Sequence, residues 1–94
     1  MNRADRILVY KTQRCGYCNA AIRYLTEKKG FEVDVIDLTG DFQARAELVK
    51  ASGQRTVPQI WVGQTHVGGF DDLRAMDRAG RLDPLLDAVT QAKN

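Results

Sequence analysis

The sequence predicts an α/β domain with a four-stranded mixed sheet flanked by helices, in the order β-α-β-α-β-β-α-α. The chain has 94 residues, a length that suits a single domain covering residues 1–94. Strand and helix patterns alternate in the first half, which requires a right-handed crossover between two parallel strands. In the second half, two short apolar runs surround Gly63-Gln64, a combination typical of an antiparallel hairpin.

The first half of the chain predicts two strands and two helices. Residues 7–10 (ILVY) are an apolar run of the kind found in buried strands. A helix-forming segment follows the two cysteines and stops at Gly30. Residues 31–38 alternate apolar and charged side chains, which predicts a second strand. Asp41 is a suitable N-cap for a second helix over about residues 42–51.

The second half predicts the hairpin and two more helices. The hairpin strands are residues 59–62 and 65–67. The first of these helices covers about residues 71–79 and stops at a glycine. The last helix covers about residues 82–92, with Asp83 as its N-cap and a proline at its first position.

Composition excludes several classes of protein. The net charge of +2 is small and no run of Lys and Arg concentrates it, so we expect no binding to nucleic acid. No stretch approaches the roughly 18 apolar residues of a membrane span. The N-terminal segment lacks the apolar core of a signal peptide. We therefore expect a cytoplasmic protein without membrane contacts, in a reducing compartment that disfavours structural disulfides.

The two cysteines of the chain, Cys15 and Cys18, form a C-x-x-C motif that has three interpretations. Structural zinc needs about four Cys or His ligands, but the chain adds only His66, on a different element. A structural disulfide would close a very small loop, which gains little stability. A redox-active pair fits best, because C-x-x-C beside a β-α-β pattern is typical of thioredoxin-like proteins.

The predicted elements give the two cysteines different roles. Cys15 falls at the N-terminus of the first helix, where unpaired N–H groups and the helix dipole stabilise an anion. Such a position lowers the pKa of a thiol and makes it a nucleophile. Cys18 lies one turn further on the same face and can attack a mixed disulfide formed on Cys15. Lys11 and Arg14 add positive charge nearby.

Two further segments are candidates for substrate contact. Pro58, in Thr56-Val57-Pro58, is either an ordinary proline at the start of a strand or follows a cis bond. A cis bond would turn the chain toward the thiols and present the backbone of Val57 to a peptide substrate. The segment Gly68-Gly69-Phe70-Asp71-Asp72 is either a turn with an N-cap or a site for an amino-acid head group. Its helix N-terminus would take the carboxylate and its aspartates the ammonium.

Together, these motifs resemble the glutaredoxin family, and most of all its small bacterial dithiol members. The matching segments are Val9-Tyr10, C-G-Y-C, RTVPQIWV and HVGGFDDL, within a core of about residues 6–87. The resemblance implies a thioredoxin fold and an enzyme, a glutathione-disulfide oxidoreductase. It would reduce protein disulfides and glutathione mixed disulfides with glutathione as cosubstrate, without a tightly bound cofactor. We expect a monomer whose partners are glutathione and disulfide-containing or glutathionylated proteins.

The resemblance also implies the roles of individual residues. Cys15 is the nucleophile and Cys18 the resolving thiol. Val57 pairs with the cysteinyl backbone of glutathione, the segment 69–72 holds its γ-glutamyl end, and Arg45 contacts its glycine carboxylate. The implied glutathione-binding residues are Lys11, Tyr17, Arg45, Thr56, Val57, Pro58, Gly69, Phe70, Asp71 and Asp72.

The sequence departs from the family pattern in two places. Gly16 replaces the proline that usually follows the first cysteine, and a small residue there sometimes accompanies a [2Fe–2S] cluster. The alternative function is therefore a dimer that binds such a cluster through Cys15 and glutathione, although the C-G-F-S signature of monothiol carriers is absent. The family's lysine position holds Thr12, with Lys11 one residue earlier, so Arg14 or Arg55 are alternative cations.

Tyr24 and Trp61 are expected to be core or half-buried packing residues. His66 is expected to be structural or exposed, and the proposed chemistry does not need it. A third functional alternative is a thioredoxin-like electron donor that a flavoenzyme reduces. The predicted head-group site argues against it, because such a donor has no need to bind glutathione.

Overall fold

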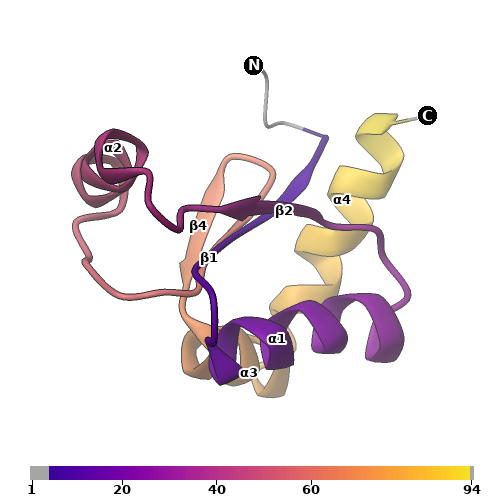
Figure 1. Ribbon diagram of the computed structural model, residues 1–94. Helices are drawn as coiled ribbons and strands as arrows, with labels where there is room; N and C mark the ends of the chain where they lie inside the picture. The colour runs from indigo at the N-terminus through magenta and orange to yellow at the C-terminus, as the bar shows by residue number, and fades with distance from the viewer. Residues whose placement is uncertain (1–4, 94) are drawn as a thin grey trace.

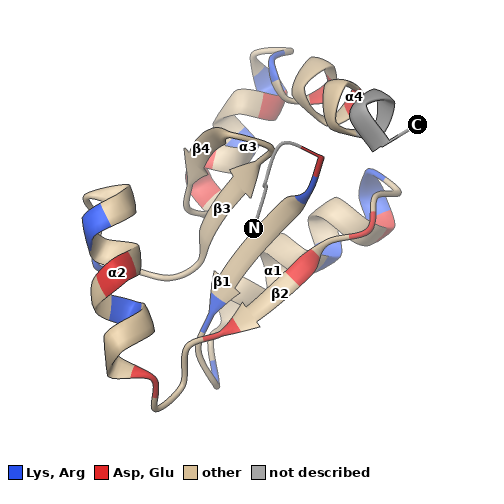
Figure 2. Ribbon diagram, turned by 90° about the horizontal axis from the view of Figure 1, so that it is seen from above, with Lys and Arg blue, Asp and Glu red and all other residues tan. Residues whose placement is uncertain are grey.

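The protein is built around a four-stranded mixed sheet. The computed structural model describes the backbone of residues 5–93 and the side chains of residues 5–89. Within this part of the chain the strand order is β2-β1-β3-β4 (Figures 1 and 2). β1 (Ile7–Lys11) pairs in parallel with β2 (Asp34–Asp37) and antiparallel with β3 (Gln59–Val62). β4 (Thr65–Gly68) completes the hairpin with β3, so the predicted sheet is confirmed.

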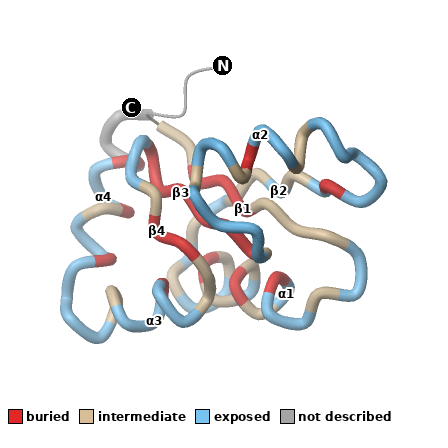
Figure 3. The backbone as a smooth tube through the Cα atoms, turned by 90° about the vertical axis from the view of Figure 1, so that its left-hand side faces the viewer, coloured by how far each residue is buried: buried red, intermediate tan, exposed pale blue. Residues whose placement is uncertain are grey.

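Helices cover both faces of the sheet. α1 (Gly16–Arg23) continues as a π-helical segment, η1 (Tyr24–Lys28), and α3 (Phe70–Arg78) lies beside α1 below the sheet (Figures 1 and 3). α4 (Leu82–Lys93) follows and packs against α3 and β3. α2 (Phe42–Ser52) lies on the opposite face. None of the helices in the described residues has the length and apolar composition of a membrane span.

Alternation along the strands divides the core into two clusters, because successive side chains point to opposite faces. The larger cluster lies under α1, α3 and α4, and the smaller lies under α2. The buried members of the larger cluster are Ile7, Val9, Ala21, Leu25, Ile60, Val62, Val67, Leu73, Leu82, Leu86 and Val89. Those of the smaller cluster are Leu8, Leu38, Leu48 and Trp61. Charged residues gather on helices and at strand ends, so the middle of the sheet is uncharged (Figure 2).

The predicted cap of α2 is confirmed. Oδ1 of Asp41 accepts a hydrogen bond from the N–H of Ala44 at 3.0 Å. This bond satisfies one of the N–H groups that the first turn of a helix leaves unpaired.

Two predicted element boundaries and one predicted cap are wrong. β2 begins at Asp34 rather than at residue 31, because Phe31 and Val33 pack against the larger cluster instead of pairing in the sheet. α4 begins at Leu82, as predicted, but Leu82 is fully buried and Asp83 lies in the first turn, so Asp83 is not the N-cap. α3 begins at Phe70, and Gly69 is its N-cap.

Candidate active site

The first cysteine lies where β1 gives way to α1. Cys15 is the N-cap of α1, and Arg14 before it has a left-handed backbone with φ of 57°. The sulfur of Cys15 accepts a hydrogen bond from the N–H of Cys18 at 3.1 Å. The structure thus places this sulfur at the helix N-terminus, as predicted, where the helix dipole favours negative charge.

The two cysteines form a disulfide and differ in exposure. Their Cα atoms are 5.2 Å apart. Cys18 is 0% exposed, whereas Cys15 is partly exposed. A substrate can therefore reach the sulfur of Cys15 but not that of Cys18. Tyr17, between them in the sequence, is 67% exposed.

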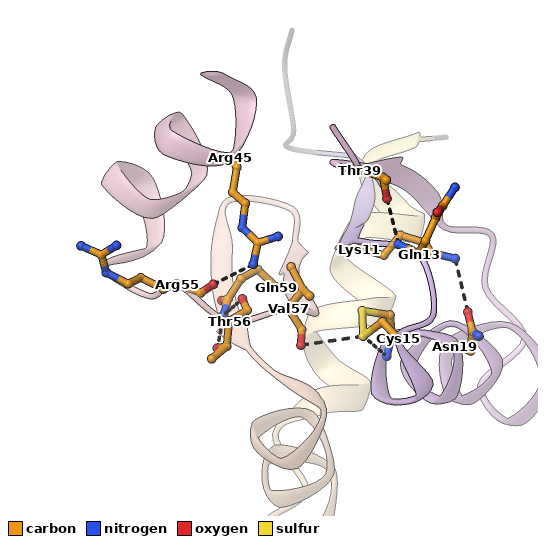
Figure 4. The surroundings of a disulfide bond; sticks show 11 residues. Lys11, Gln13, Cys15, Asn19, Thr39, Arg45, Arg55, Thr56, Val57 and Gln59 are labelled. Atoms are coloured by element: carbon orange, nitrogen blue, oxygen red, sulfur yellow. Dashed lines mark hydrogen bonds between the residues drawn. A yellow bond between two sulfur atoms is a disulfide. The ribbon is translucent and has the colours of Figure 1, made fainter. Parts of the chain in front are cut away.

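The Thr56-Val57-Pro58 segment lies beside this disulfide. The Val57–Pro58 peptide bond is cis. The carbonyl oxygen of Val57 lies 3.9 Å from the sulfur of Cys15, although the two residues are 42 positions apart in the sequence (Figure 4). A disulfide sulfur carries no hydrogen, so this approach is a van der Waals contact rather than a hydrogen bond. Of the two alternatives that the sequence leaves open, the structure has the cis bond, and the segment lies against the disulfide.

The Gly68–Asp72 segment forms the junction between β4 and α3. Oδ2 of Asp72 accepts a hydrogen bond from the N–H of Gly69 at 2.9 Å, which closes the first turn of α3. Gly68 has φ of 109°, and a Cβ atom there would lie 2.5 Å from Oδ2 of Asp72. Glycine is therefore required at Gly68 by backbone conformation and by space. The ring of Phe70 packs edge-on against Tyr24, with centroids 5.9 Å apart.

A cavity of about 230 Å³ joins the two segments. Its lining includes every predicted glutathione-binding residue except Lys11 and Arg45. The lining residues are Tyr17, Thr56, Val57, Pro58, Gly69, Phe70, Asp71 and Asp72.

The two predicted cations outside the cavity have partners within the protein. Nζ of Lys11 donates to Oδ1 of Asn19 at 3.4 Å. Nη2 of Arg45 donates to the carbonyl oxygen of Arg55 at 3.2 Å (Figure 4). Arg45 thereby supports the loop that precedes Thr56.

A larger cavity, of about 510 Å³, lies between α2 and the sheet. Its lining is mainly apolar and includes Leu8, Tyr10, Leu48 and Trp61. No cysteine lines it. No cysteine lines the smaller cavity either, but Val57 does, and its carbonyl oxygen lies 3.9 Å from the Cys15 sulfur. The smaller cavity is therefore the candidate active site, because it opens beside the reactive sulfur.

Sequence analysis missed Gln59, the buried polar residue behind this site. Its side chain is 0% exposed and bonds to the Thr56 carbonyl on one side and to His66 on the other. The available signal was a polar residue at the start of an otherwise apolar strand. His66 is half-buried against Trp61, with ring centroids 4.4 Å apart, and burial lowers the pKa of its imidazole.

Comparisons with known proteins agree with the predicted family. The sequence model described as Glutaredoxin matches residues 7–67. A glutaredoxin of Pseudomonas aeruginosa is 49% identical over 82 residues, covering 87% of this chain and 96% of that protein. Glutaredoxin 3 of Escherichia coli K12 is 42% identical over 78 residues, covering 83% of this chain and 93% of that protein.

Solved structures agree as well. The crystal structure of a buckwheat glutaredoxin–glutathione complex superposes with a TM-score of 0.81 at 32% identity. The match covers 93% of this chain and 81% of that one. The four-stranded sheet with its flanking helices is therefore the thioredoxin fold that the sequence predicts. By its sequence, its fold and its C-x-x-C pair, the chain belongs to the glutaredoxin family of thiol–disulfide oxidoreductases.

Proposed function

We propose that the protein is a glutathione-dependent oxidoreductase that reduces protein disulfides and glutathione mixed disulfides. The observation that carries this proposal is the cavity beside Cys15, which the Thr56–Pro58 and Gly69–Asp72 segments enclose together. Support also comes from the buckwheat glutaredoxin, which was crystallised as a complex with glutathione.

Glutathione would lie across this cavity with its sulfur at Cys15. The backbone of Val57, already 3.9 Å from the Cys15 sulfur, would pair with the cysteinyl residue. The N-terminus of α3 would bind the γ-glutamyl carboxylate, and the exposed carboxylates of Asp71 and Asp72 would bind its ammonium group. Arg45 and Lys11 would attract the glycine carboxylate from the rim.

The reaction begins with the reduced protein. The Cys15 thiolate attacks the glutathione sulfur of a mixed disulfide, so that a Cys15–glutathione disulfide forms and the old disulfide breaks. The leaving thiolate takes a proton from solvent. A second glutathione thiolate then attacks the glutathione sulfur on Cys15, which yields oxidised glutathione and regenerates the Cys15 thiolate. The N–H of Cys18 and the α1 dipole stabilise this thiolate.

A protein disulfide would take a second route. Cys15 attacks one of its sulfurs and releases the other as a thiolate. The Cys18 thiolate then attacks the Cys15 sulfur, which forms the observed Cys15–Cys18 disulfide and releases the reduced substrate. Two glutathione molecules return the pair to thiols. The reaction needs a reduced glutathione pool such as that of the cytoplasm, the predicted location.

The test measures reduction of a glutathionylated peptide with glutathione, glutathione reductase and NADPH. We expect Cys15→Ser to reduce the rate to background, and Cys18→Ser to keep this activity but lose reduction of protein disulfides. Full activity in Cys15→Ser would contradict the assignment of the nucleophile. Turnover without glutathione, supported by a flavoenzyme, would instead indicate a thioredoxin-like donor.

A second candidate function is a dimer that binds a [2Fe–2S] cluster. It is favoured by Gly16, where an added Cβ would meet no atom within 4 Å, so packing does not require glycine. The described residues hold no group of three His, Cys, Asp or Glu that could bind a metal. The ligands would therefore be Cys15 thiolates from two chains and two glutathiones.

Anaerobic reconstitution with iron, sulfide and glutathione tests this candidate. A coloured dimer in the wild type, with Gly16→Pro colourless yet active as a reductase, would support it. A colourless monomer in the wild type would contradict it and favour the monomeric enzyme.

A further inference from the structure

Gln59 is an unusual residue for the start of a central strand. It directly follows Pro58 and pairs with Tyr10 of β1, and the other residues of β3 are apolar. Its side chain is 0% exposed, the one buried polar side chain among residues 5–89. A buried amide is costly unless its donors and acceptor are all hydrogen-bonded, so its partners show what it stabilises.

The amide nitrogen of Gln59 faces the loop between α2 and β3. Nε2 donates to the Thr56 carbonyl oxygen at 2.9 Å and to Oε1 of Gln54 at 2.8 Å, and Oγ1 of Thr56 lies 3.3 Å away. Figure 4 shows Gln59 close to Thr56, with Val57 between these two residues and Cys15. The carbonyl that Gln59 holds thus belongs to the peptide unit that leads into Val57.

The amide oxygen of Gln59 faces β4. It lies 2.7 Å from Nε2 of His66. Since the acceptors around Gln59 fix the orientation of its amide, Nε2 of His66 must carry the hydrogen. His66 in turn packs on Trp61 and lies two residues before Gly68. Gln59 therefore joins the two walls of the cavity, the Thr56–Pro58 loop and the strand that leads to Gly69.

Strand pairing alone does not hold the loop. The pairing of β3 with β1 ends at Gln59, so Thr56 and Val57 lie beyond the sheet. Thr56 is exposed, and the side chain of Val57 is only half-buried against the smaller cluster. Without the amide of Gln59, the Thr56 carbonyl would lose its buried donor, and the Val57 backbone would become free to shift relative to Cys15.

We propose that Gln59 is a positioning residue that holds the Thr56–Val57 backbone in the orientation needed to bind glutathione beside Cys15. This inference rests on the proposed function. Gln59 touches no reacting atom, so its removal should weaken substrate binding and leave the reactivity of the Cys15 thiol unchanged.

The experiment compares the wild type with Gln59→Met and Gln59→Glu. Gln59→Met keeps the length of the side chain and removes its hydrogen bonds, whereas Gln59→Glu keeps the shape and the acceptor and removes the donors. Gln43→Met, at an exposed position of α2, is the matched control. Urea unfolding identifies which variants are folded under assay conditions.

We expect KM for a glutathionylated peptide to rise about tenfold in the folded Gln59 variants, with kcat changed far less, because misplacing a binding group by about 1 Å is enough for such losses. The rate of Cys15 alkylation by iodoacetamide should match the wild type. An unchanged KM would overturn the proposal. A rise in KM with an equally large fall in the rate of Cys15 alkylation would also overturn it, because that would indicate general damage to the site.

The NMR order parameter of the Val57 N–H separates this proposal from the proposed function, because it reports directly how firmly this backbone is held. The order parameter should be lower in Gln59→Met and Gln59→Glu than in the wild type and unchanged in Gln43→Met. If the wild type does not turn over the glutathionylated peptide, the proposed function is wrong, and the order parameter of Val57 then decides the positioning role. An unchanged order parameter in the Gln59 variants overturns it.

Discussion

The two faces of the sheet are packed in different ways. The face under α1, α3 and α4 is a continuous cluster of aliphatic side chains. The face under α2 has a much smaller cluster and borders a cavity of about 510 Å³. The same face carries the polar pair Gln59 and His66. Stability thus comes mainly from one face, and the precise placement of the Thr56–Pro58 loop comes from the other.

The attachment of α2 explains this difference. Leu48 is the one buried residue that α2 contributes. The helix is also held by its Asp41 cap and by the bond from Arg45 to the Arg55 carbonyl. α2 therefore contacts the core through one buried side chain and the active-site loop through Arg45. We expect substitutions in α2 to affect activity more than stability.

The largest expected effect is loss of stability on the α4 side. Leu86 is 0% exposed and lies in the larger cluster. Leu86→Ala should lower the free energy of unfolding by about 2–5 kcal/mol, because it leaves a cavity in a closely packed core. Urea unfolding measures this loss. The folded variant should keep the KM of the wild type, and a raised KM would show that the two faces are not separable.

Gly68→Ala should have the next largest effect. The added Cβ would lie 2.5 Å from Oδ2 of Asp72 in a backbone with φ of 109°. We expect a destabilisation of about 1–3 kcal/mol from strain and a raised KM, because Asp72 must move away from Gly69. Gly80→Ala is the control, since Gly80 also has positive φ but an added Cβ meets no atom within 4 Å. Equal KM values in both variants would contradict the role of Asp72.

Leu48→Ala should cost less stability than Leu86→Ala but, unlike Leu86→Ala, should raise KM. Leu48 borders the existing cavity under α2, so the variant adds to a space that is already present. The loss of stability should be about 2 kcal/mol or less, at the low end for such substitutions. KM should rise, because α2 carries Arg45 and with it the support of the Arg55 carbonyl. A loss of unfolding free energy as large as that of Leu86→Ala, with KM unchanged, would contradict the difference between the two faces of the sheet.

The parts of the site that sequence predicted depend on local patterns. A C-x-x-C at the start of a helix places one sulfur at the helix N-terminus wherever it occurs, and the Gly68–Asp72 segment forms a turn into a helix. The role of Gln59 could not be predicted, because its hydrogen-bond partners come from two segments, Gln54 and Thr56 in the loop after α2 and His66 on β4. Asp83 failed as a cap because Leu82 is drawn into the core and Lys29 binds the Asp83 carboxylate at 3.0 Å.

The smallest expected effects are two losses of folding stability on acidification, one from each face of the sheet and each at a different pH. On the α2 face, burial lowers the pKa of His66, while the nearby Asp72 opposes this change. The unfolded chain therefore binds a proton more readily, and stability should fall as pH drops below the ordinary histidine value of about 6.5. On the other face, hydrogen bonds from Lys29 and then Tyr24 lower the pKa of Asp77. Its contribution should persist until pH falls below the ordinary aspartate value of about 3.9.

Two variants test whether His66 and Asp77 cause these two losses of stability, each of which is a step in the pH profile. His66→Gln keeps a donor toward Gln59 and should remove the loss of stability between neutral pH and about pH 5, because no imidazole remains to be protonated. Asp77→Asn should leave that step in place and reduce the one below about pH 4, because the ion pair between Asp77 and Lys29 is then absent at every pH. The remainder of the acid step would come from Asp37, whose pKa is lowered by its hydrogen bonds with Thr39. Urea unfolding from pH 3 to pH 8 measures both steps. If Asp77→Asn instead removed the step near neutral pH, the polar groups of the two faces would be coupled through the sheet, and the division of stability and positioning between the faces would be wrong.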